Sequence, residues 1–287
     1  MDPLEIAPEL FWVMAGLLGL MVGSFLNVVI HRLPIMLEKA WRRDCEVLLG
    51  QDPQPPEYPV FNLLMPGSHC PQCGKPVAVL ENIPVISFLL LGGRCSGCHA
   101  GISWRYPVVE TLTAILSVIV AWRFGATVQA AAALVLTWSL IALSFIDLDR
   151  QLLPDVITLP MLWLGLLLSV FTVFEDSSAS IVGAVCGYLI LWLVYQVFKL
   201  LTGRVGMGYG DFKLLAMLGA WLGWSRLPMI VLMSSLVGAV VGLLMILIQQ
   251  RDHRIPIPFG PFLALAGWVA LLWGDQLNTA YLGLMSS

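Results

Sequence analysis

The sequence predicts an all-α protein that crosses a membrane about eight times and carries one small polar insert between its first two membrane helices. Hydrophobic residues make up 59% of the 287 residues and charged residues only 11%, and the mean hydropathy is +0.87. This composition is typical of a polytopic membrane protein and excludes a soluble enzyme with a large core. Apolar runs of spanning length recur along the chain, and one long polar stretch interrupts them.

The first apolar run, Leu10–Ile30, is long enough to span a bilayer. The sequence His31-Arg32-Leu33-Pro34 follows it and combines positive charge with a proline, which predicts that the helix ends there. Residues 1–9 contain acidic residues but no Lys or Arg, so no cleavable signal peptide is expected. We therefore expect residues 1–30 to form a first transmembrane helix that stays in the protein.

The polar insert, residues 31–105, holds five of the six cysteines. Cys70-Pro71-Gln72-Cys73 and Cys95-Ser96-Gly97-Cys98 are two C-x-x-C motifs separated by 21 residues, a spacing typical of tetrathiolate zinc sites. A pair of disulfides is the alternative, which a reducing cytoplasm disfavours. The sequence thus predicts a small zinc-ribbon-like domain in which a structural zinc ion is bound by Cys70, Cys73, Cys95 and Cys98.

Residues 106–287 are predicted to form a membrane-embedded core. Several of its apolar runs are short or interrupted by glycine, so the total of eight spans is uncertain by one or two. If the insert is cytoplasmic, thirteen of the fifteen Lys and Arg residues lie on its side of the membrane and only Arg123 and Arg226 on the other, which places both termini outside the cytoplasm. The runs are Val108–Trp122, Val128–Ile146, Val156–Phe174, Ala179–Leu201, Phe212–Trp224, Leu227–Ile248 and Phe262–Trp273.

Two aspartates lie at the ends of apolar runs on the predicted cytoplasmic face. Asp147 follows Ile146 directly, and Asp211 follows the glycine-rich stretch 206–210, whose glycines allow positive φ and close backbone approach and suit a mobile loop. A carboxylate there is costly unless it is used or partnered. Two carboxylates that meet in a low-dielectric site share one proton, which provides an acid and a base for peptide hydrolysis without a metal.

The other carboxylates after the third span have simpler interpretations. Asp149 is expected to pair with Arg150 in a solvated loop, and Asp155 has the position of a helix cap, although a substrate-binding role for it stays open. The G-x-G-x-G pattern of residues 206–210 does not predict a nucleotide site, because no βαβ unit surrounds it.

Two other classes of protein compete with a protease. A transporter could couple protons through aspartates at the membrane edge, but no inverted repeat is visible and the carboxylates gather at one face rather than at mid-membrane. An assembly subunit without catalysis is the third class. Other protease types are disfavoured, since the sequence contains neither H-E-x-x-H nor G-x-S-x-G.

An aspartate that ends one span and a G-x-G-D loop that opens another resemble the membrane aspartyl proteases. Nearly the whole chain, about residues 16 to 270, resembles the bacterial type IV prepilin peptidases, which are bifunctional leader peptidases and N-methyltransferases. The motifs that carry this resemblance are Gly23–Pro34, the two C-x-x-C motifs with Glu81–Pro84 between them, Gly92–Cys95, Arg105–Glu110, Asp147–Asp155 and Gly208–Asp211.

The resemblance implies that Asp147 and Asp211 are catalytic. Type IV prepilins and type II secretion pseudopilins would lose their basic leader after a glycine at the cytoplasmic face of the bacterial inner membrane, and S-adenosylmethionine would methylate the new N-terminal residue. Gly93 and Glu110 are candidates for the methyl-donor site, and an ion pair with Arg105 is the alternative for Glu110. The expected partners are these pilins and membrane lipid and not nucleic acid, and an oligomer is a possibility that the sequence leaves open.

Overall fold

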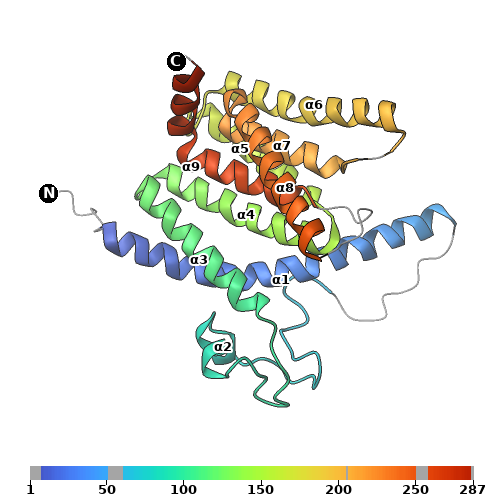
Figure 1. The fold of residues 1–287 in the computed structure, drawn as a ribbon. Helices are drawn as coiled ribbons and strands as arrows, with labels where there is room; N and C mark the ends of the chain where they lie inside the picture. Colours follow the sequence, from blue (N-terminus) through green and yellow to red (C-terminus); the bar gives the residue numbers. More distant parts are fainter. Residues whose placement is uncertain (1–7, 51–60, 205, 250–257, 286–287) are drawn as a thin grey trace. The chain divides into compact units, whose positions relative to one another are not determined.

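The computed structural model describes residues 8–50, 61–204, 206–249 and 258–285, and within these ranges the chain is all-α, as predicted (Figure 1). It forms two compact units, Met1–Ala126 and Thr127–Ser287. The helices of the first unit are α1 (Pro8–Leu48), η1 (Val79–Asn82), α2 (Ile86–Leu90) and α3 (Arg105–Phe124). Those of the second are α4 (Val128–Arg150), α5 (Asp155–Val170), α6 (Ser177–Thr202), α7 (Tyr209–Leu222), η2 (Trp224–Arg226), α8 (Leu227–Gln249) and α9 (Gly260–Met285).

In the first unit, α1 and α3 approach each other closely along a row of glycines on α1. A Cβ atom at Gly19 would lie 2.8 Å from Ala114 Cα, and one at Gly23 would lie 2.7 Å from Glu110 Cα. Small residues allow the backbones of membrane helices to come this near, and the resulting van der Waals contact holds such helices together.

The predicted helix end at residues 31–34 is wrong, because α1 runs on through Pro34 to Leu48. An interior proline costs about 3 kcal/mol, but the residues after it are mostly strong helix formers. Glu38 also precedes Arg42 by one helical turn, an arrangement that stabilises a helix. The buried Arg32 side chain donates hydrogen bonds to Asn62 O (3.1 Å) and Pro66 O (2.6 Å), and thereby fastens the following loop to α1.

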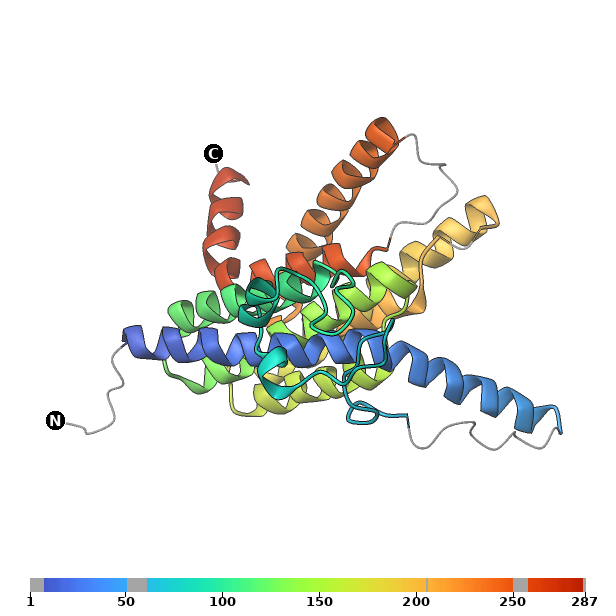
Figure 2. The same ribbon diagram turned by 90° about the horizontal axis from the view of Figure 1, so that it is seen from below.

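The core of the second unit is α7. Eleven of its fourteen residues are buried, and α5, α6 and α9 contact it. By contrast, the far end of α8 projects from the other helices of this unit (Figure 2) and exposes Leu243, Leu247 and Ile248. A helix that is apolar on all sides and enclosed by other helices is a buried core helix, so α7 is the element on which this unit is assembled.

Six of the eight predicted spans fall within single helices, whereas Val156–Phe174 runs past the end of α5 and Phe212–Trp224 past the end of α7. The helices also differ in length. Five are long and apolar enough to cross a membrane: α1, α3, α4, α6 and the segment Trp224–Met245. At 16 residues α5 is shorter, and the 14 residues of α7 reach only about 21 Å, less than the hydrocarbon thickness of about 30 Å. The last predicted span ends at Trp273, where α9 has a break with non-helical φ of −128°.

The crossing of α6 and α7 leaves no room for a side chain. A Cβ atom at Gly219 would collide with the carbonyl oxygen of Gly183, which is a backbone atom and cannot rotate away. We expect Gly219→Ala to lower the free energy of unfolding by about 2–3 kcal/mol, measured by denaturant titration in detergent. In the matched control, Gly238→Ala, the new methyl group meets only the movable Phe262 ring at 3.3 Å, and equal losses for the two variants would contradict the prediction.

Candidate active site and metal centre

Asp147 lies in the last turn of α4 and not in the loop beyond it. The helix continues to Arg150 and ends with Gln151 in the left-handed conformation (φ 51°), whose N–H donates to Asp147 O. The Asp147 side chain is therefore fixed to a rigid element, and the residue is only 6% exposed. Its carboxylate oxygen Oδ2 accepts a hydrogen bond of 3.0 Å from the backbone N–H of Gly260.

Asp211 lies in the first turn of α7, three residues after the N-cap Gly208. It is 7% exposed, and a negative charge is stabilised at this end of a helix dipole. Its N–H donates to Gly208 O (3.3 Å). The structure thus places both predicted catalytic aspartates at buried helix ends within the second unit.

The two carboxylates belong to one cluster, in which Leu153 lies beside Gly210 and Gly260, the neighbours of Asp211 and Asp147. A Cβ atom at Gly210, next to Asp211, would lie 2.8 Å from Leu153 Cβ, and one at Gly260 would lie 3.2 Å from Leu153 Cδ2 and 2.5 Å from Asp147 Oδ2. The negative charge of Asp147 also acts on Asp211. The arrangement therefore brings together two buried carboxylates that repel each other when both are ionised.

The glycines before Asp211 serve close packing rather than unusual backbone angles. The expectation of positive φ is wrong for Gly206, Gly208 and Gly210, whereas Gly203, at the end of α6, does have it (φ 68°). A Cβ atom at Gly206 would lie 2.8 Å from the Phe198 ring. Gly206 and Gly210 each lie against a side chain, so the close-approach part of the expectation is confirmed at these two positions.

Asp155 does not cap α5, so the prediction of a helix cap is wrong. The N-cap is Pro154, and Asp155 is the first residue of the helix. Its carboxylate instead accepts two hydrogen bonds from Lys213 Nζ, at 2.8 and 2.7 Å. The ion pair joins the first turn of α5 to the first turn of α7, two residues beyond Asp211. A local sequence pattern could not reveal it, because its partners are 58 residues apart.

The four cysteines of the insert converge as predicted. Their sulfur atoms all lie within 4.8 Å of one another, with Cys70 and Cys98 3.8 Å apart and Cys73 and Cys95 4.0 Å apart. All four are free thiols, so the structure does not contain the alternative pair of disulfides. Backbone N–H groups of Cys73 and Gln72 lower the pKa of Cys70 to about 6, which favours the thiolate that binds metals. The cluster can hold a metal ion.

The two C-x-x-C motifs are built alike. In each, the first cysteine donates its N–H to a carbonyl oxygen five residues later and accepts an N–H from four residues later, and an isolated β-bridge closes the turn. These bonds are Cys70 N–H to Lys75 O, Gly74 N–H to Cys70 O, Cys95 N–H to Ala100 O and His99 N–H to Cys95 O, all 2.8 to 2.9 Å, and the bridges are His69 with Pro76 and Arg94 with Gly101.

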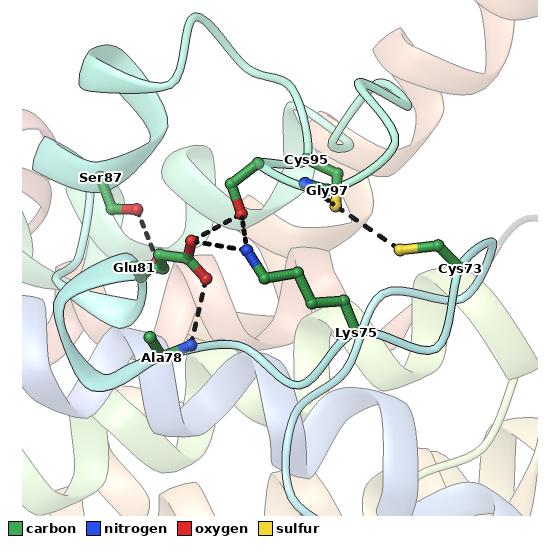
Figure 3. Close-up of polar contacts among 8 residues, drawn as sticks. Cys73, Lys75, Ala78, Glu81, Ser87, Cys95 and Gly97 are labelled. Atoms are coloured by element: carbon green, nitrogen blue, oxygen red, sulfur yellow. Dashed lines mark hydrogen bonds and ion pairs between the residues drawn. The ribbon is translucent and has the colours of Figure 1, made fainter.

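A polar network outside the sulfur cluster joins the two motifs (Figure 3). Glu81, between them in sequence, accepts hydrogen bonds from Ser96 Oγ (2.5 Å) and from Ala78 N–H (3.1 Å). Lys75 Nζ donates to Ser96 Oγ at 2.7 Å and lies 3.4 Å from Glu81 Oε1. The bond from Ser96, with those from Ala78 and Lys75, holds the pKa of Glu81 below its usual range. The insert is thus held together by polar contacts as well as by the sulfur cluster.

The two candidate methyl-donor residues lie at opposite ends of α2. The Glu110 carboxylate accepts a hydrogen bond of 2.8 Å from the N–H of Val85, which precedes α2, and it is bonded to the Ser24 side chain. Gly93, just after α2, has φ 68°, and a Cβ atom there would lie 3.0 Å from the Phe88 ring. These contacts give both residues a structural role around α2.

Comparison with known proteins places the chain in a family. Residues 17–124 match the model of the bacterial peptidase A24 N-terminal domain, and residues 134–243 match that of the type IV leader peptidase family. The prepilin leader peptidase/N-methyltransferase of Pseudomonas aeruginosa is 55% identical over 282 residues, which cover 98% of this chain and 97% of that protein. The chain is a member of the type IV prepilin leader peptidase/N-methyltransferase family.

Other members of the family are similar over their full length. The proteins of the same name from Aeromonas hydrophila and Legionella pneumophila are 55% and 46% identical to this chain. The alignment with the first covers 97% of both sequences, and the alignment with the second covers 96% of both. The two matched regions fall within the two compact units, since the first ends at residue 124 and the second begins at 134, on either side of the boundary after Ala126. No solved structure matches the chain.

Proposed function

We propose that this protein is a membrane aspartyl endopeptidase that removes the basic leader of type IV prepilins and type II secretion pseudopilins after a glycine. It then methylates the new N-terminal residue with S-adenosylmethionine. The observation that carries the proposal is the buried cluster that contains Asp147 and Asp211, in a chain 55% identical to a prepilin leader peptidase/N-methyltransferase. One carboxylate activates a water molecule while the other protonates the amide oxygen.

The site is suited to its substrate by charge as well as by chemistry. Asp149 and Asp155 lie on the same short stretch of chain as Asp147, and carboxylates gathered there attract a leader rich in Lys and Arg. We place the protein in the bacterial inner membrane, with the active site and the insert facing the cytoplasm, where such a leader is found. Residues 106–287 are the protease core in this proposal.

The proposed metal is a structural zinc ion in the insert, residues 31–105. A zinc ion with Zn–S bonds of about 2.3 Å needs sulfur atoms about 3.8 Å apart in a tetrahedron, and two of the sulfur pairs are 3.8 and 4.0 Å apart. Four thiolates leave no open position for chemistry. Residues 1–30 are then the membrane anchor that precedes this insert.

The methyl donor supplies an electrophilic methyl group when it is bound. We propose that it binds near the insert, and Gly93 and Glu110 are the residues to test. Because both are engaged in packing around α2, no step of the transfer is assigned to either side chain.

The test uses the purified full chain in detergent and a pilin substrate with a basic leader, a glycine before the cut and an apolar helix. Mass spectrometry should detect loss of the leader and, after addition of S-adenosylmethionine, one added methyl group. A substrate with valine in place of that glycine is the matched control and should stay intact. Absence of cleavage would refute the proposal, and proton flux in liposomes would then favour the transporter.

A further inference from the structure

The last helix of the second unit begins at the catalytic cluster. The first residue of α9, Gly260, donates its backbone N–H to Asp147 Oδ2 at 3.0 Å. The first N–H groups of a helix have no partner within it, and in this first turn Pro261 has none to give, while the N–H of Phe262 donates to Phe259 O. The Gly260 N–H therefore has no partner within its own helix. It donates a hydrogen bond to the Asp147 carboxylate, which lies 113 residues away in the sequence.

Only glycine fits at this contact. Gly260 is buried, and a Cβ atom there would lie 2.5 Å from Asp147 Oδ2 and 3.2 Å from Leu153 Cδ2. A larger residue would displace the carboxylate. The position lies beyond residues 134–243, which match the family model.

We propose that Gly260 is the positioning residue that holds Asp147 in its ionised form, so that Asp147 is the base and Asp211 carries the shared proton as the acid. The inference rests on the proposed function and deepens it by giving the two carboxylates different tasks. A hydrogen bond from an N–H to a carboxylate favours the charged form, and the positive end of the α9 dipole acts in the same direction, against the negative end of the α4 dipole, where Asp147 lies. The Asp211 carboxylate is bonded to the backbone of Gly208 at the start of its own helix, whereas the donor to Asp147 comes from a separate helix and lies at 3.0 Å.

The charged groups around Asp147 do not reverse this assignment. The first turn of α9 holds no acidic residue, and α7 contributes Asp211. From α5 comes Asp155, whose charge Lys213 neutralises. On α4 itself, Asp149 and Arg150 follow Asp147 in the exposed last turn of the helix, where solvent screens their charges.

With these roles the reaction balances. The Asp147 carboxylate takes a proton from water, the water oxygen bonds to the carbonyl carbon, and Asp211 gives its proton to the carbonyl oxygen. The resulting diol collapses as the C–N bond breaks. Protonated Asp147 then donates to the leaving nitrogen while ionised Asp211 recovers a proton from a diol hydroxyl, which restores the starting state.

The first test is Gly260→Ala, assayed for leader cleavage across pH. We expect kcat to fall by up to about 100-fold because the carboxylate is displaced, with KM for the pilin unchanged. Loss of the donor also disfavours ionised Asp147, so the acidic limb of the rate profile should move about one pH unit higher. The matched control is Gly267→Ala, which adds the same methyl group on α9 against Leu218 Cδ2 at 2.5 Å and should leave the limb unmoved.

A second measurement does not depend on a variant of Gly260. The dipeptide Phe-Gly occurs only at residues 124–125 and 259–260, so labelling phenylalanine carbonyl carbons and glycine nitrogens selects two amide signals in an NMR spectrum of the full chain. The Gly260 signal should shift with pH over the acidic limb and lose that shift in Asp147→Asn. The Gly125 signal should stay constant, because its N–H donates to a carbonyl oxygen, that of Ala121.

The outcomes separate this inference from the proposed function. If the wild-type chain cleaves pilin but Gly260→Ala keeps the wild-type acidic limb, or Gly267→Ala moves it equally, the assignment of roles is wrong while the peptidase proposal stands. A Gly260 amide signal that does not respond to pH would also overturn the assignment. If the wild-type chain cleaves no pilin substrate, the proposed function itself fails.

Discussion

Asp147→Asn and Asp211→Asn should each reduce the rate of leader cleavage by at least about 1,000-fold. An amide cannot exchange a proton with water or with the peptide at neutral pH, so either change removes one half of the acid and base pair. The two changes together should cost little more than one alone, since the carboxylates act as a unit. The measurement is a single-turnover assay with purified variants and the pilin substrate.

The matched control for this prediction is Asp149→Asn. It removes a carboxylate from the same helix end, but from an exposed position, and should reduce cleavage less than about tenfold through weaker attraction of the basic leader. Folding of all variants is compared by thermal unfolding. A folded Asp147→Asn or Asp211→Asn variant that cleaves at nearly the wild-type rate would show that these aspartates are not the catalytic pair.

The second large effect concerns the metal. The double variant Cys70→Ser, Cys95→Ser removes one sulfur atom from each C-x-x-C motif, and we expect zinc to fall from about one ion per chain to none, because a structural zinc site needs all four thiolates. Without the metal the insert has little core of its own, so limited proteolysis should cut within residues 61–104. Zinc is measured by elemental analysis of the purified protein.

Two cysteines outside the cluster provide the control. Cys45 and Cys186 are also free thiols, and replacing both by serine should leave the zinc content and the protease pattern unchanged. If the Cys70 and Cys95 variant retained the wild-type zinc content, the tetrathiolate site would be refuted.

The local sequence was sufficient to predict a structural feature wherever one short stretch of residues contains the physical cause of that feature. Apolar runs predicted the helices because burial of each run away from water is favourable wherever the run lies in the fold. The C-x-x-C spacing predicted the sulfur cluster because a tight turn brings both thiols of a motif to one side. The prediction failed at Pro34. Positive charge and a proline suggested that the helix ends there, but the residues after Pro34 continue the same helix.

The sequence by itself determined the helical membrane fold, the cluster of four cysteines and the two aspartates to test, since these follow from residue type and spacing. Only the tertiary structure decided that Asp155 pairs with Lys213 and that Gly260 donates to Asp147. These contacts join residues 58 and 113 positions apart. The donor at Gly260 is a backbone N–H, which nearly every residue possesses, so its role is fixed by where α9 begins in space and leaves no mark in the residue type except the absence of a side chain.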